Sequence, residues 1–184
     1  VDDILQLKDP DFRSLVETRI LLELKSVRLA SLRRTEEELE QIEAALNAYE
    51  EARKVTPESS YPIGNLASLH LHQGNREKAE FYYQRVLRAA VLQLDDDPRD
   101  PWTRADYAQA KLALGDADGA LEELTTMLEH VHGQQGLIET VRYGLLFLGE
   151  SPEPLPGLDA MIQLLDDELA RREHEAESGQ GSED

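Results

Sequence analysis

Cysteine is missing from the chain, and so are long apolar runs. None of the 184 residues is cysteine, which excludes disulfides, thiolate nucleophiles and cysteine-ligated zinc. No apolar run approaches the roughly 18 to 20 residues that cross a bilayer, and the longest is GLLFLG at residues 144–149. The first residues also lack the basic flank and apolar stretch of a secretion signal. We therefore expect a soluble, cytoplasmic protein.

Basic residues are scarce relative to acidic ones. The sequence has 38 Asp and Glu against 19 Lys and Arg, and its formal net charge is -19. A surface of this charge repels the phosphates of nucleic acids and the headgroups of anionic membranes. We therefore expect neither nucleic acid nor a membrane among the partners.

Motifs of catalysis and cofactor binding are absent as well. The sequence contains no GxSxG, HExxH, P-loop or dinucleotide-binding glycine pattern. His70 and His72 stand two residues apart on a predicted helix. Their side chains are then about 200° apart around its axis, so they cannot bind one metal ion together. We expect no enzyme activity, no catalytic residue, no metal and no cofactor.

Helical periodicity runs through almost the whole chain. From Phe12 onward, apolar residues recur every three or four positions, which predicts a long first helix. The second helix is predicted to begin at Thr35, where TEEE forms a capping box, and to stop at Pro57. No segment has the alternation of a strand, so the sequence predicts an all-α protein. Further helices are predicted at residues 61–72, 75–94, 101–113, 116–131, 137–148 and 158–173.

A pattern of small and aromatic residues recurs along these helices. Its first copy ends in the spacing A-x3-[FY]-x2-A-x4-P, a second copy follows after 34 residues, and a third comes 41 residues after the second. The residues in register are Ala45, Tyr49, Ala52 and Pro57, then Ala79, Tyr83 and Val86, then Ala108, Gly115, Ala120, Leu124 and Met127. This pattern resembles the tetratricopeptide repeat family, whose repeat length is 34 residues. Because the third copy comes later than that length, the second helix of the second pair should extend past its neighbours.

The resemblance implies a right-handed superhelical solenoid of antiparallel helix pairs, with about eight helices. The repeat domain would cover residues 1–173, and a tail at residues 174–184 is acidic, has no apolar residue beyond alanine and should be disordered. The last helix would cap the solenoid with a polar outer face. The four units are expected at about residues 11–57, 61–98, 101–132 and 137–173.

In the tetratricopeptide family, the first helix of each pair lines a concave groove that holds a peptide or a helix of a partner. The resemblance therefore implies a protein–protein interaction scaffold, and the acidic surface favours a basic partner segment with an apolar anchor. Self-association into a homo-oligomer is a further possibility. The residues implied for the groove are Tyr61, Asn65, Ser68 and His72 in the second unit and Trp102, Asp106 and Gln109 in the third.

A second resemblance covers residues 9–46, from DPDFRSLVETRILL to EQIEAAL. This stretch is similar to the opening helices of the ligand-binding domain of fatty-acid-responsive GntR-type regulators. It implies a sensory domain with a small ligand held between helices. That domain usually carries an Asp and several His that bind a metal, and beyond residue 50 this chain lacks them in order. The sensory domain and a self-associating scaffold are the two alternatives to the peptide-binding scaffold.

Overall fold

The computed structural model describes residues 36–55, 59–131 and 133–180, and its seven elements over these ranges are all α-helices. The prediction of an all-α protein is confirmed for this part of the chain. The predicted helix beginning at Phe12 and the capping box at Thr35 lie outside the described residues. The chain divides into two compact units, residues 1–45 and 46–184, and helix α2 (Glu36–Val55) spans the boundary between them.

Helices α3 (Ser60–His72) and α4 (Arg76–Asp96) form a hairpin in the second unit. Gly74 between them has φ 75°, a left-handed conformation that glycine adopts without steric cost. Its N–H donates to the carbonyl of Leu71, and the N–H of Asn75 donates to that of His70. The Asn75 side chain then caps α4 by accepting from the N–H of Lys78. The sequence QGN therefore both ends α3 and starts α4.

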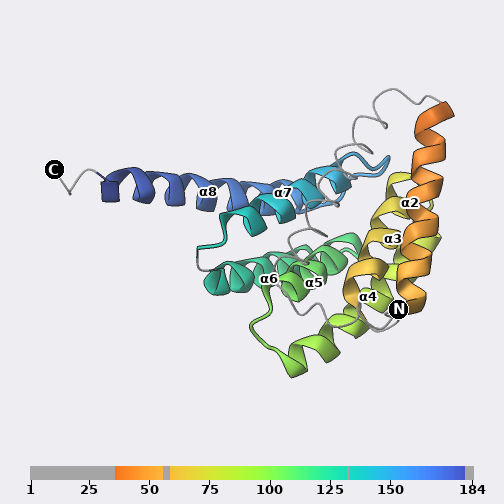
Figure 1. The fold of residues 1–184 in the computed structure, drawn as a ribbon, viewed down its shortest axis with the longest axis horizontal. Coiled ribbons are helices and arrows are strands. Elements are labelled where there is room, and N and C mark those ends of the chain that lie inside the picture. The colour runs from red at the N-terminus through yellow and green to blue at the C-terminus, as the bar shows by residue number, and fades with distance from the viewer. Residues whose placement is uncertain (1–35, 56–58, 132, 181–184) are drawn as a thin grey trace, which may run out of the picture. The chain divides into compact units, whose positions relative to one another are not determined.

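Helices α5 (Pro101–Ala113) and α6 (Ala117–His130) form a second hairpin (Figure 1). Its turn, LGD, has Gly115 at φ 92°. Asp116 caps α6 by accepting from the N–H of Gly119 at 3.0 Å. At the other end, Asp100 caps α5, which has proline in its first turn, where a backbone N–H would have no partner in the helix.

Helix α4 is longer than its partner, as the sequence predicts. It has 21 residues against 13 in α3, and the difference of eight corresponds to about 12 Å of helix. Val91 and Leu92 near its end are exposed, which fits a helix end that extends beyond α3.

The core of the second unit lies where the two hairpins meet each other and the helices α7 (Gln135–Gly149) and α8 (Leu158–Gln180). Alanines with no exposed surface allow the helix axes to approach closely. Tyr83 is the largest of the fully buried side chains. The core also contains Ile63, Ala67, Leu71, Ala79, Val86, Ala108, Leu112, Ala120, Leu124, Met127, Ile138, Leu145, Leu148, Met161 and Leu165.

Helices α7 (Gln135–Gly149) and α8 (Leu158–Gln180) lie side by side, and α7 also contacts α3 and α5 (Figure 1). The connector between them, residues 150–157, reaches the turns of both hairpins. A Cβ on Gly74 would lie 3.5 Å from Cγ of Pro152, and a Cβ on Gly157 would lie 2.6 Å from Cβ of Ala117. Arg76 adds an ion pair with Glu153 at 2.6 Å. The connector thus ties the two hairpins together at their turns.

Helix α8 continues to Gln180, through part of the segment whose composition predicts disorder. Arg171 pairs with Glu168 and with Glu175 one turn away, and such spacings favour the helix. The predicted unit boundaries and the superhelical arrangement remain predictions. No helix among the described residues is long and apolar enough to cross a membrane.

Candidate functional site

The residues predicted on α3 to line a groove are engaged within the helix or against neighbours. The ring of Tyr61 packs edge to face on Tyr49 of α2, with centroids 6.4 Å apart. Asn65 donates from Nδ2 to the Tyr61 carbonyl at 2.9 Å. Ser68 donates from Oγ to the Gly64 carbonyl at 3.0 Å. Two of these three contacts therefore satisfy backbone carbonyls of α3 itself.

Ser68 and His72 also contact other helices. Ser68 Oγ lies 3.0 Å from the hydroxyl of Tyr83 on α4. A serine has one proton to give, and Gly64 receives it, so Tyr83 is the donor of this bond. The ring of His72 stacks on Phe147 of α7 with centroids 4.7 Å apart. Both residues therefore contribute to packing between helices.

The residues predicted on α5 also pack against other parts of the protein. Trp102 is partly buried and packs against the core. Gln109 lies close to α7, where a Cβ on Gly144 would be 3.2 Å from its Nε2. None of the seven predicted residues lines the pocket between α6, α7 and α8. The structure brings Tyr61 and Asn65 together and places the remaining five at separate helix contacts.

Asp106 belongs to a polar cluster that joins three helices. Its Oδ2 accepts from the hydroxyl of Ser60 at 2.6 Å, and the N–H of Ser60 donates to Gln93 of α4 at 3.2 Å. Burial raises the pKa of Asp106 to about 7, the hydrogen bond from Ser60 opposes this, and the negative charge of Asp100 adds to it. The cluster therefore holds helices together with a carboxyl group that titrates near neutral pH.

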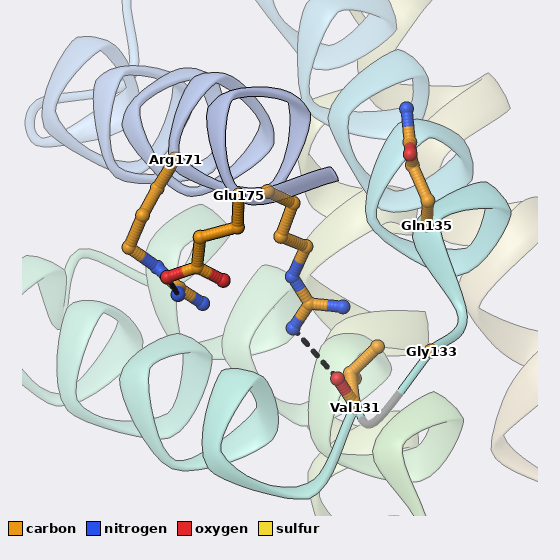
Figure 2. A pocket seen from close by; sticks show the side chains of 6 residues that line it. Val131, Gly133, Gln135, Arg171 and Glu175 are labelled. Carbon is orange, nitrogen blue, oxygen red and sulfur yellow. Dashed lines mark hydrogen bonds and ion pairs between the residues drawn. The ribbon is translucent and has the colours of Figure 1, made fainter. Parts of the chain in front are cut away.

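A pocket of about 350 Å³ lies where α6 ends, α7 begins and α8 passes (Figure 2). Figure 2 shows Arg171 and Glu175 side by side on α8, and Gln135 on the first turn of α7. The chain between α6 and α7 completes the wall with an apolar side chain and a glycine. The lining residues are Val131, Gly133, Gln135, Arg171, Arg172 and Glu175.

Arg172 is fixed in the wall of this pocket. Its Nη2 donates to the Val131 carbonyl at 2.6 Å, and its Nε donates to Glu168 at 2.6 Å. Hydrogen bonds from Arg171 and Arg172 hold the pKa of Glu168 down at about 2, so this carboxylate stays ionised. The resulting network connects α8 to the end of α6.

The first turn of α7 forms another side of the pocket. Gln134 precedes it without a side-chain cap, and the turn contains no acidic residue. The positive end of the helix dipole is therefore uncompensated by the helix's own side chains. Together with the arginines, it gives the pocket groups that can bind a carboxylate, while Glu175 can bind a cation.

Sequence reasoning missed the pocket because it assigned Arg171 and Arg172 to the polar face of a capping helix and Glu175 to a disordered tail. The adjacent arginines gave no signal, because a second such pair stands at residues 33–34. Val131, the partner of Arg172, is 41 residues away in the sequence, and no spacing rule connects them.

The structure offers no fit for a metal ion among the residues that it describes. No group of three or more His, Asp or Glu in these ranges is placed to hold one. Two of the histidines stack on aromatic rings, His70 on Tyr82 and His72 on Phe147. The metal site that the GntR resemblance implies is therefore not formed by these residues.

Comparison with known proteins gives one family. The FCD domain matches residues 14–73. This domain is the C-terminal domain of GntR-type regulators. None of the curated proteins compared with the chain matches it. The matched region contains residues 14–46 of the stretch that resembles the GntR-type ligand-binding domain in sequence.

The FCD match overturns the tetratricopeptide assignment. The match covers most of the first predicted unit and the first helix of the second. The assignment to the tetratricopeptide family is therefore wrong, and so is the peptide-binding scaffold function that this assignment implied. The pattern does not identify the family, because any antiparallel helix pair that packs closely has small residues where its helices cross. Ala79 and Ala120 are such buried small residues in the structure, and residues of this kind are not specific to one family.

Proposed function

We propose that this chain is the ligand-binding regulatory part of a GntR-type transcriptional regulator. The match of the FCD domain to residues 14–73 carries the proposal, because FCD domains occur in regulators that bind small molecules. The helical structure is consistent with it, since FCD domains are helical. The role is binding and regulation, without catalysis.

The pocket between α6, α7 and α8 is the proposed ligand site. Small-molecule sites are concave and combine apolar walls with a few convergent polar groups. Here Val131 gives apolar surface, Gln135 an amide, and Arg171, Arg172 and Glu175 charged groups. Its volume of about 350 Å³ suits a small metabolite.

Ligand binding would act through the position of α8. Arg172 already links α8 to the carbonyl of Val131 at the end of α6, and a ligand that contacts α7 and α8 together would favour one arrangement of these helices. A ligand shifts such an equilibrium only by its difference in affinity for the two states. The response therefore depends on contacts made from both sides of the pocket.

Because this chain is acidic, we propose that another part of such a regulator contacts the DNA. With a net charge of -19, this chain itself would repel phosphate groups, and we propose that it binds no nucleic acid and no membrane. A cytoplasmic location and self-association are part of the same proposal. The basic peptide partner was implied by the scaffold interpretation, which the FCD match overturns.

A thermal-shift screen tests the proposal. The purified chain is heated with a library of small metabolites that includes anions, cations, zwitterions and neutral compounds. A ligand that binds only the folded state raises the melting temperature in proportion to the logarithm of its concentration. In the full-length regulator, the same compound should change the affinity for operator DNA. A library without any stabilising compound, or a ligand without effect on DNA binding, would count against the proposal.

A further inference from the structure

We propose that the pocket between α6, α7 and α8 binds a small zwitterion, a free amino acid. This inference rests on the proposed function, since it names the ligand of that site. The juxtaposition that carries it is the pair of Arg171 and Glu175 (Figure 2), which lines a hollow of about 350 Å³ together with Arg172.

Arg172 supplies a fixed partner for the ligand carboxylate. Its Nε and Nη2 are used by Glu168 and by the Val131 carbonyl. A guanidinium has five N–H groups, so the two on Nη1 are available to an incoming carboxylate. Arginine binds carboxylates well when its geometry is set in advance. The two existing bonds provide that geometry.

Glu175 supplies a partner for the ligand ammonium group. It pairs with Arg171 at 2.5 Å, and both side chains are more than half exposed. An exposed ion pair of this kind contributes little, because water screens it and both side chains lose freedom. A ligand with charges of both signs can enter between Arg171 and Glu175 and replace their contact with one to each. Neither residue is then left without a partner.

The balance of charge favours a zwitterion over an anion. The lining has two arginines and one glutamate, and Glu168 lies directly behind them, bonded to both arginines. Two positive and two negative groups therefore cancel. The chain as a whole carries -19, so a free anion is repelled on approach, whereas a zwitterion has no net charge to repel. Specificity then comes from the arrangement of charges, not from their sum.

Calorimetric titration of the purified chain tests the inference. The probes are the twenty L-amino acids, followed for the tightest binder by two analogues, one without the ammonium group and one without the carboxylate. We expect the amino acid to bind at least tenfold more tightly than either analogue. Arg171→Ala should weaken binding of the amino acid tenfold or more. The side chains of Arg171 and Glu175 are both exposed, so variants at these two positions should fold.

Glu175→Gln gives the sharpest readout, because it should act in opposite directions on two probes. It removes the partner of the ammonium group, so the amino acid should bind at least tenfold more weakly. It also removes a negative charge beside the arginines, so the analogue without the ammonium group should bind more tightly. Glu122→Gln and Arg88→Ala are matched controls at exposed positions, and they should leave both affinities unchanged.

The outcomes separate this inference from the proposed function. If a metabolite binds the chain but neither Arg171→Ala nor Glu175→Gln affects it, the ligand lies elsewhere. The zwitterion inference and the assignment of the ligand to this pocket then fail, while the proposed role in ligand-dependent regulation stands. The inference also fails if the analogue without an ammonium group binds as well as the amino acid. If no compound of any charge binds, both the inference and the proposed function are wrong.

Discussion

The hairpins α3–α4 and α5–α6 have the same construction at positions 41 residues apart. Gly74 and Gly115 both adopt positive φ between their helices. In each turn, the glycine N–H donates three residues back and the next N–H donates five residues back. Asn75 and Asp116 then accept from an N–H three residues on. Each turn thus ends one helix and starts the next by the same bonds.

The buried residues of the two hairpins correspond at the same spacing. Alanine occupies the crossing points in both, while the larger positions differ in chemistry. Tyr83 in α4, with a hydroxyl bonded to Ser68, corresponds to Leu124 in α6, which has no polar atom. The matched buried pairs are Ala67 and Ala108, Leu71 and Leu112, Ala79 and Ala120, Tyr83 and Leu124, and Val86 and Met127.

Positions with polar side chains differ much more. His70 stacks on Tyr82 in the first hairpin, with ring centroids 5.6 Å apart. The residues 41 positions on are Lys111 and Glu123, which form an ion pair at 3.2 Å. The spacing of small and large residues therefore determines the hairpin, whereas polar contacts between its helices are interchangeable. The spacing therefore predicts a fold and does not identify a family.

The largest expected effect comes from the matched core positions. Tyr83→Ala should lower the free energy of unfolding by about 3 to 5 kcal/mol, because the buried ring leaves a cavity. Leu124→Ala should cost about 2 to 4 kcal/mol for the same reason at smaller volume. Urea unfolding followed by the fluorescence of Trp102 measures both. Equal and small losses at the two positions would mean that the hairpins do not share one core.

Most of the helices could be predicted from the sequence, since the apolar periodicity indicates the helices and the Gly and Pro residues indicate the breaks between them. The helices predicted at 61–72 and 101–113 correspond to α3 and α5. The extension of α8 to Gln180 was missed, because low apolar content indicates disorder unless the ion pairs of Arg171 along the helix are counted. Composition does not contain that pairing.

The second effect concerns the interchangeable polar contacts. Glu123 pairs with both Arg104 and Lys111, and all three side chains are largely buried. Glu123→Gln should cost about 1 to 3 kcal/mol, because two cations lose their partner in a poorly hydrated place. At the corresponding position, Tyr82→Phe removes one bond to Glu50 and should cost about 0.5 to 1.5 kcal/mol. A larger loss for Tyr82→Phe would reverse this ranking.

A third effect should be equal in the two hairpins. Gly74→Ala and Gly115→Ala each place a Cβ at positive φ, which costs about 1 to 2 kcal/mol. No atom within 4 Å would meet the new Cβ at Gly115, and at Gly74 only Pro152 would touch it, at an ordinary 3.5 Å. Thermal unfolding of the two variants therefore tests whether the turns are equivalent. A difference of more than about 1 kcal/mol would show that the connector at Pro152 bears on the first turn alone.

The pocket could not be predicted in the same way, because its residues come from α7, α8 and the chain that follows α6, whose relative placement the periodicity leaves open. Val131 and Arg172 are brought together by packing of α8 on α6. Asp106 was predicted, but as a residue exposed in a groove. The structure places it against Ser60 at the start of α3, and a helical pattern in α5 cannot specify what another helix presents to it.

The smallest expected effect changes Asp106 into the residue found at the matching position of the first hairpin, which is Asn65. Burial raises the pKa of Asp106 from 3.8 to about 7. The folded protein therefore holds a proton that the unfolded chain has lost, and stability from this group is full below pH 3.8 and declines as the pH rises to about 7. Between pH 6 and 8, its ionisation should lower the free energy of unfolding by about 1 kcal/mol.

Asp106→Asn should abolish this decline, because the amide is neutral at every pH and can still bond to Ser60. Other groups titrate in the same window. His70 has a pKa lowered by burial and by the nearby charge of Lys78, so its contribution rises with pH and partly masks that of Asp106 in the natural protein. Tyr83, which also contacts this region, has a raised pKa and stays neutral throughout. The difference between the pH profiles of the natural protein and the variant cancels both.

Urea unfolding at pH 6, 7 and 8 gives that difference directly. We expect the stability of Asp106→Asn relative to the natural protein to rise by about 1 kcal/mol from pH 6 to pH 8. Asp95→Asn, at an exposed position of α4, is the control, and we expect a flat difference for it. A flat difference for Asp106→Asn as well would mean that Asp106 is already ionised at pH 6. Its bond to Ser60 would then outweigh the cost of burying the charge.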